Sequence, residues 1–243
     1  KALLPGLARE APREGYRRMR ERVCALVEPI SCKALQRLWR ILQLQVKPRK
    51  RSRKRGKRLP VVAGLRATGP NHVWCMDFMK DWTLNDRAVR ILSVVDEYTR
   101  ECLALVVARR LTAADVVAVL EVLLWRHGRP AHVRSDNGPE FVATLVVQWA
   151  AQVGIELVRS APASPWQNPF SESFHSRVRD ELTEGNVFGS LEEAQVLCEA
   201  YRQWYNTERQ HSALRYQTPA AFAVQVSNLG SVLGQPGLAV AQA

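Results

Sequence analysis

The sequence predicts an α/β domain, built on a mixed sheet with helices on its faces and preceded by a small helical region. Two observations predict this. After residue 70, three consecutive strand-like segments are followed by helical and strand-like segments in alternation. Before residue 47, the apolar residues recur at helical spacing instead. With 243 residues, of which 47% are hydrophobic, the chain has room for one medium domain and a smaller one.

The amino-terminal residues predict two helices in succession. The first is expected over residues 14–27 and the second over residues 32–44, with Ser31 placed to cap the second. A short helical pair rich in arginine is typical of a helix-turn-helix, so residues 1–46 are predicted to bind DNA. The alternative is a two-helix support for the larger domain.

Residues 47–69 predict a basic linker. The chain has 35 basic and 23 acidic residues, and nine of the cations lie in residues 47–58, which leaves a net charge of only about +3 for the remainder. Like charges at this density keep a segment extended until a polyanion neutralises them. A nuclear-localisation signal is the alternative reading of such a run. We predict DNA contacts at Lys47, Arg49, Lys50, Arg51, Arg53, Lys54, Arg55, Lys57 and Arg58.

Residues 70–227 are expected to form the core, and the Gly-, Ala- and Gln-rich tail at 228–243 is expected to be disordered. The predicted strands cover residues 73–79, 87–96, 101–108, 133–136 and 155–158. The predicted helices cover residues 113–125, 139–153, 168–182 and 191–205, with Thr112 and Ser190 as caps. Four tryptophans on apolar faces are read as core or interface residues: Trp39, Trp125, Trp149 and Trp204.

Three acidic residues stand where these elements would present them at one edge of the sheet. Asp77 interrupts an apolar strand, so if buried it needs a metal ion or a paired cation. Asp136 ends a strand, and Glu172 follows in a helix after 35 intervening residues. Three such carboxylates can hold two divalent cations, which serve to break and rejoin phosphodiester bonds. Ordinary alternatives exist, because Asp136 before Asn-Gly can form an Asx turn and a helical glutamate is uninformative alone.

Four stretches of the core resemble the integrase-like catalytic domain of bacterial insertion-sequence transposases, which are related to retroviral integrases. The helical pair, with its Gly-Tyr-Arg-Arg at residues 15–18, resembles the helix-turn-helix that precedes this domain in the same proteins. The four stretches are Trp74-Cys75-Met76-Asp77, residues 135–141, residues 164–168 with 172–174, and Tyr205-Asn206 with Arg209, His211-Ser212 and Thr218-Pro219.

The resemblance implies a ribonuclease H-like fold in which Asp77, Asp136 and Glu172 are the catalytic and metal-binding triad. It also implies a basic residue seven positions after the glutamate, where Arg179 stands, two helical turns away on the same face. Pro169 replaces a residue that is usually small in this family, and we expect the helix to begin there.

Three further side chains lie close in sequence to the third acid. Gln167 and Asn168, on the loop before it, are predicted DNA contacts, and the alternative is that they pack the loop. His175, three residues after Glu172 on the same side of the helix, is predicted to contact phosphate or water near the site, and the alternative is a surface histidine.

The predicted function is that of a DNA transposase, which cleaves strands at the ends of a transposable element and transfers the 3′-hydroxyl into target DNA. Oxygen-only ligands favour Mg²⁺, with Mn²⁺ as a substitute, and two ions per site are expected. The predicted partners are double-stranded DNA, as element ends and target, and further copies of the chain in a homo-oligomer on DNA. The alternatives are a catalytically silent DNA-binding repressor derived from a transposase and a ribonuclease H-type enzyme.

The composition also predicts where the protein acts. The five cysteines form no CxxC pair, which indicates reduced, buried thiols. Neither a long apolar stretch nor a signal-peptide pattern occurs, so no membrane partner and no small-molecule substrate are expected. We therefore expect a cytoplasmic bacterial protein at the nucleoid. The chain begins with Lys1 rather than Met, as a fragment would.

Overall fold

The computed structural model describes residues 2–12, 14–27, 29–45, 65–159, 169–184 and 187–233, with the side chains of 229–233 excepted. The nine predicted DNA contacts from Lys47 to Arg58 lie outside the described residues, as do Gln167 and Asn168. The chain forms two compact units, one from Lys1–Leu59 with Gln210–Gln217 and the other from Pro60–Arg209 with Thr218–Ala243.

Among its described residues, the first unit contains three short α-helices with a hydrophobic core of their own and a 3-10 helix at Ser212–Leu214. Helix α3 begins at the predicted cap, where the Ser31 hydroxyl accepts a hydrogen bond from the Ala34 N–H. Helix α1 was not predicted, because Pro5 and Gly6 lie within it, yet proline is tolerated in a first helical turn. The helices are α1 (Leu3–Glu10), α2 (Tyr16–Leu26) and α3 (Cys32–Ile41). Their buried core consists of Leu4, Leu7, Met19, Val23, Leu35 and Trp39.

The second unit is built on a five-stranded mixed sheet, as predicted. The strand order is β3-β2-β1-β4-β5. Strands β1, β2 and β3 pair antiparallel in sequence, whereas β4 lies parallel to both β1 and β5. The strands are β1 (Val73–Trp82), β2 (Ala88–Asp96), β3 (Cys102–Ala108), β4 (His132–Ser135) and β5 (Glu156–Arg159).

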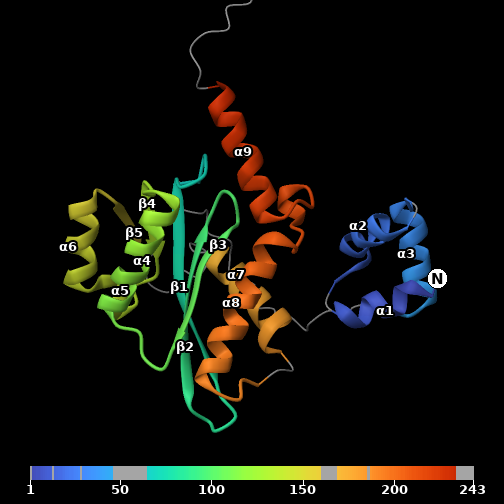
Figure 1. The fold of residues 1–243 in the computed structure, drawn as a ribbon, viewed down its shortest axis with the longest axis horizontal. Helices are drawn as coiled ribbons and strands as arrows, with labels where there is room; N and C mark the ends of the chain where they lie inside the picture. The colour runs from blue at the N-terminus through green and yellow to red at the C-terminus, as the bar shows by residue number, and fades with distance from the viewer. Residues whose placement is uncertain are drawn as a thin grey trace, which may run out of the picture. The chain divides into compact units, whose positions relative to one another are not determined.

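Helices cover both faces of this sheet (Figure 1). Helices α4, α5 and α6 bury one apolar cluster around Trp74, Leu92 and Leu120. Helices α7 and α8 bury a second cluster on the opposite face, around Ile91 and Phe174. The bounds are α4 (Ala113–His127), α5 (Pro139–Val142), α6 (Thr144–Val153), α7 (Pro169–Val178), a π-helical turn (Arg179–Thr183), α8 (Leu191–Thr207) and α9 (Pro219–Leu233).

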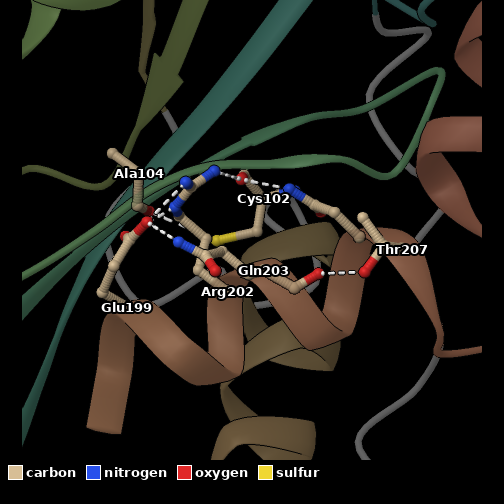
Figure 2. Close-up of polar contacts among 7 residues, drawn as sticks. Cys102, Ala104, Glu199, Arg202, Gln203 and Thr207 are labelled. Atoms are coloured by element: carbon tan, nitrogen blue, oxygen red, sulfur yellow. Dashed lines mark hydrogen bonds and ion pairs between the residues drawn. The ribbon is translucent and has the colours of Figure 1, made fainter. Parts of the chain in front are cut away.

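The free edge of β3 is covered by polar side chains of α8 (Figure 2). The Asn206 amide accepts a hydrogen bond from the Cys102 N–H and donates one to the Cys102 carbonyl, each at 2.9 Å, as a neighbouring strand would. Arg202, which donates to Glu199 at 2.7 Å, also reaches this carbonyl at 3.4 Å. An uncovered strand edge invites pairing with other chains, so Asn206 stabilises the sheet.

Several predicted boundaries differ from the structure. The helix expected over 139–153 is divided at Ala143, whose φ of −56° and ψ of 139° are not helical. The helix expected over 168–182 changes from α to π geometry after Val178. The last helix reaches Leu233, so residues 228–233, expected to be disordered, are helical. The rest of that tail lies outside the described residues.

Two expectations about burial were also wrong in part. Trp39 and Trp149 are buried, but Trp125 is 85% exposed, so of the two alternatives for Trp125, core or interface, only the interface stays as a prediction. All five cysteines are free, and three are buried, but Cys32 is exposed. Among the described helices, none is long and apolar enough to cross a membrane.

Candidate functional site

Asp77 lies in β1, and Asp136 directly follows the neighbouring strand β4. The parallel register of the two strands pairs Cys75 with Arg134, so Asp77 and Asp136 each stand two residues beyond this pair. On the other side of β1, Asp77 pairs with Ser93 of β2. Because alternate residues share a face, these side chains point to the face that α7 covers.

The Asp77 carboxyl group is partly buried and short of positive charge. Its side chain is 20% exposed. One oxygen, Oδ1, accepts a hydrogen bond of 2.7 Å from the Phe78 N–H. Burial is the main reason why the pKa of Asp77 is raised to about 6, and the hydrogen bond from Phe78 opposes this rise. The charges of Asp136 and Glu172 add to the rise in this pKa, while Arg179 opposes it.

The charges of Asp136, Glu172 and Arg179 each act on the Asp77 carboxyl group. Because Coulomb interactions fall with distance, each of the three lies within electrostatic range of Asp77.

Asp136 shapes the turn in which it stands. Its Oδ1 accepts a hydrogen bond of 2.9 Å from the Gly138 N–H, so the Asx turn considered from the sequence is present. A Cβ at position 138 would lie 3.0 Å from this oxygen and 3.3 Å from the Phe141 ring. Glycine therefore leaves room for the Asp136 carboxyl group, which stays exposed at the surface.

Helix α7 and the first residue of the π-helical turn that follows it carry three polar side chains near Asp77. The helix begins at Pro169, as expected. Glu172 lies in the first turn, and His175 and Arg179 follow at three and seven positions, which is one side of a helix. Glu172 and Arg179 are exposed, and partial burial raises the pKa of Glu172. His175 is only 5% exposed, so the alternative of a surface histidine was wrong.

Two sets of contacts that the sequence did not reveal support this region. The first lies behind Asp136, where Glu140 forms an ion pair with Arg90. The Arg90 guanidinium lies 4.1 Å from the centroid of the Phe78 ring, and Phe78 stacks on Phe141 at 4.8 Å. These contacts join the turn after Asp136 to strands β1 and β2.

The second set anchors the π-helical turn that starts at Arg179. Glu181 accepts two hydrogen bonds of 2.7 Å from Arg209 and one of 3.0 Å from the Tyr201 hydroxyl. Arg209 is 2% exposed. The ion pair fixes the end of α7 against α8 and thereby limits where Arg179 can lie.

The carboxylates of Asp77, Asp136 and Glu172 have the donor atoms that a hard divalent cation prefers. Three carboxylates supply oxygen donors only, as Mg²⁺ and Mn²⁺ prefer. The repulsion that helps to raise the pKa of Asp77 is the repulsion that a bound cation would relieve. Within the described ranges, however, no three or more His, Cys, Asp or Glu side chains are grouped closely enough to hold a metal ion.

Comparisons with known proteins match the same part of the chain. Two models of the integrase core domain match residues 67–165 and 153–219. The uncharacterized 31.7 kDa protein of insertion element IS407 from Burkholderia multivorans is 36% identical over 224 residues, which are 92% of this chain and 80% of that protein. The chain belongs to the insertion-element transposases with an integrase core domain.

Other members of this family match less completely. The uncharacterized 39.2 kDa protein of insertion element IS476 from Xanthomonas euvesicatoria is 35% identical over 223 residues, which are 91% of this chain but 64% of that protein. The transposase for insertion sequence element IS904 from Lactococcus lactis is 27% identical over 160 residues, or 65% of this chain and 63% of that protein. The chain therefore spans about two thirds of the length of these two relatives.

Solved structures confirm the ribonuclease H-like fold. The HTLV-2 integrase catalytic core domain, in complex with magnesium, has a TM-score of 0.52 at 15% identity, covering 65% of this chain and 99% of that chain. A chain of the simian T-cell lymphotropic virus intasome has a TM-score of 0.57 at 18% identity, covering 65% of this chain and 56% of that chain. At such identities the likeness concerns the fold alone.

Proposed function

We propose that this protein is a DNA transposase that cuts strands at the ends of a transposable element and joins the freed 3′-hydroxyl to target DNA. The proposal is supported by two observations: the charges of Asp136, Glu172 and Arg179 act on the Asp77 carboxyl group, and the chain belongs to the insertion-element transposase family. Membership of the family supports the reaction class, and the three carboxylates are the groups that would bind the cations for it.

The three carboxylates would hold Mg²⁺, with Mn²⁺ as a substitute and two ions per site. When bound, such ions polarise the phosphate, activate the attacking oxygen and stabilise the oxygen that leaves. The attacking oxygen belongs to water in the first step and to the 3′-hydroxyl in the second. In each step one phosphorus–oxygen bond forms and the bond to the leaving 3′ oxygen breaks, and that oxygen takes up a proton.

The remaining residues of the chain bind and orient DNA. Arg179 is exposed and meets phosphate, and Gln167 and Asn168, which precede α7 in the sequence, contact DNA. The nine cations between Lys47 and Arg58, in the linker 47–69, bind the phosphate backbone in a salt-dependent manner. The helical region 1–46 binds DNA as a helix-turn-helix, while the core of residues 70–227 performs the reaction.

Two element ends must be brought together before they are joined to one target. We therefore propose that the chain acts as a homo-oligomer on double-stranded DNA, in the bacterial nucleoid. The HTLV-2 integrase catalytic core domain has been solved in a trimeric form, and this supports the proposal because a core of this fold can associate.

The test compares variants of two aspartates of strand β1. It measures cleavage and joining of labelled DNA duplexes whose sequences come from the DNA that flanks the gene. Asp77 and Asp81 each accept a hydrogen bond from the next N–H, at 2.7 Å and 2.8 Å, so Asp81→Asn is a matched control. Wild type and Asp81→Asn are expected to cleave and join strands when Mg²⁺ is present. Asp77→Asn is expected to lose both steps and to keep DNA binding.

Three outcomes would contradict the proposal. Strand transfer retained by Asp77→Asn would refute the assignment of the acid. DNA binding without Mg²⁺-dependent cleavage by wild type would favour a silent repressor. Cleavage of an RNA–DNA hybrid without any strand transfer would favour a ribonuclease H-type enzyme.

A further inference from the structure

A row of three side chains leads from the interior of the sheet to Asp77. The hydroxyl oxygen of Ser93 lies 2.8 Å from Nε2 of His175. On the other side of the ring, Nδ1 of His175 lies 3.6 Å from Oδ2 of Asp77. Ser93 is 0% exposed and His175 is 5% exposed, so the only partly open end of this row is Asp77.

Serine, histidine and aspartate in this order are also the groups of a hydrolytic triad, but their burial excludes that chemistry. A triad needs its serine oxygen open to a substrate carbonyl. Ser93 lies in the middle of β2, where no substrate reaches its hydroxyl. In a hydrolytic triad the aspartate and the histidine act on the serine. Here Ser93 and His175 act on the carboxyl group of Asp77.

The surroundings determine where the hydrogens of the row lie. An ionised Asp77 carboxylate only accepts, so the facing Nδ1 of His175 carries the ring hydrogen. The other ring nitrogen, Nε2, is then an acceptor that lies 2.8 Å from the Ser93 hydroxyl, and the Asp77 carbonyl is a second acceptor for this hydroxyl at 3.3 Å. Burial, assisted by the charge of Arg179, lowers the pKa of His175 to about 4.

We propose that His175, held by Ser93, is a positioning residue for the Asp77 carboxylate. The Phe78 N–H holds Oδ1 at 2.7 Å, and the N–H of the histidine faces Oδ2 from the other side. The two contacts together limit rotation of the carboxyl group. This role rests on the proposed function, in which Asp77 binds the cation.

A neutral histidine suits this position better than a lysine or an arginine would. At 3.6 Å its contact with Asp77 is longer than a hydrogen bond, so it acts as a dipole that faces a charge. A full positive charge at that place would compete with a cation for the same oxygens. Neutral groups that orient a ligand typically contribute about 10- to 100-fold in metal affinity or activity.

The test measures binding of Mn²⁺ to the full chain by electron paramagnetic resonance, without DNA or turnover. His175→Ala is expected to weaken Mn²⁺ binding by about 10- to 100-fold, and Ser93→Ala to weaken it less. His175→Asn, which keeps a neutral N–H donor, is expected to recover part of the affinity. The exposed His127, changed to Gln, is the matched control and should bind Mn²⁺ as wild type does.

A second readout is the tautomer of His175, which ¹⁵N nuclear magnetic resonance reports directly. The proposal predicts hydrogen on Nδ1 in wild type, and hydrogen on Nε2 would overturn it. Cleavage assays add a kinetic signature. The Mg²⁺ concentration for half-maximal cleavage should rise in His175→Ala, while the rate at saturating Mg²⁺ changes less.

Mn²⁺ binding distinguishes an error in the positioning role of His175 from an error in the proposed function. If Asp77→Asn loses Mn²⁺ binding while folded His175→Ala and Ser93→Ala bind as wild type does, only the positioning role is overturned. If Asp77→Asn binds Mn²⁺ as tightly as wild type, Asp77 is no ligand and both proposals are overturned. If His175→Ala does not fold, Ser93→Ala and His175→Asn decide the question by the same measurement.

Discussion

Asp77 and Glu181 are carboxylates of the same layer, between the sheet and helices α7 and α8, yet their surroundings are opposite. Glu181 receives two hydrogen bonds of 2.7 Å from Arg209 and one from Tyr201. The pKa of Asp77 is raised to about 6, mainly by burial and further by the charges of Asp136 and Glu172, while Arg179 opposes the rise. The first carboxylate is neutralised within the fold, whereas the charge of Arg179 does not offset the burial and repulsion that act on the second.

The largest effect on strand cleavage is expected from removing the negative charges near Asp77. Asp136→Asn and Glu172→Gln should each lower strand cleavage by about 10³-fold or more, because groups that act as one unit fail together. DNA binding, followed by gel shift, should change little. Combining either change with Asp77→Asn should add almost nothing to the loss. Independent, additive losses would show that these acids do not act together.

Removing the partner of Glu181 should instead lower the stability of the protein. Arg209→Met leaves Glu181 buried without its cation, and we expect a loss of about 3–5 kcal/mol in the free energy of unfolding. Urea denaturation measures this directly. The double variant Glu181→Gln with Arg209→Met should regain much of the loss, because the unpaired charge is gone. A loss below about 1 kcal/mol in the single variant would contradict the assigned role of the pair.

Replacing Asp77, in contrast, should raise the free energy of unfolding. The pKa of Asp77 is raised from 3.8 to about 6 in the folded protein, so its ionised form opposes folding above pH 6. Metal-free Asp77→Asn should therefore be more stable than wild type at pH 7.5, by up to about 3 kcal/mol. The difference should shrink as the pH falls through 6 and vanish near 3.8, where wild type is protonated in both states. Thermal unfolding of both proteins across this pH range checks it.

Added Mg²⁺ provides the control for that prediction. Because the cation would neutralise Asp77 in wild type, it should narrow the gap in stability between wild type and Asp77→Asn at pH 7.5. Wild type that is already as stable as Asp77→Asn in metal-free buffer at this pH would mean that burial and the neighbouring acids do not destabilise the Asp77 carboxylate as the structure indicates.

A smaller effect is expected at the turn after Asp136. In Gly138→Ala the new Cβ would lie 3.0 Å from Asp136 Oδ1, so this carboxyl group must shift. We expect cleavage to fall about tenfold, since small displacements of a reacting group are costly, and stability to fall by about 1 kcal/mol. Gly69→Ala, at a position with no heavy atom within 4 Å, is the matched control. Equal activity of the two variants would contradict the importance of this turn.

Much of the fold could be predicted because it depends on local patterns. Ser31, Thr112 and Ser190 cap helices as expected, each accepting a hydrogen bond from an N–H three residues on. Alternation of apolar residues located the five strands to within a few residues. The π-helical turn after Val178 was missed. Within it Glu181 contacts Arg209, 28 positions away along the chain, and local sequence patterns do not reveal such a contact.

The site was predicted less completely than the fold. Asp77 drew notice because a carboxylate in an apolar strand needs a reason. Ser93 also interrupts an apolar strand, and this weaker signal could have identified it, but an isolated serine in a strand is common. Its distance to His175 depends on how α7 lies on the sheet, which spacing along the chain does not give.

The central claim is that Asp77, Asp136 and Glu172 together hold the cations that the reaction requires. The most direct measurement is a crystal structure of the protein with its element-end DNA and Mn²⁺, using anomalous scattering to locate the ions. The account predicts two ions about 3.5–4 Å apart, with Asp77 bound to them and Asp136 and Glu172 each bound to at least one. A well-ordered site whose ions contact none or only one of these three carboxylates would contradict it.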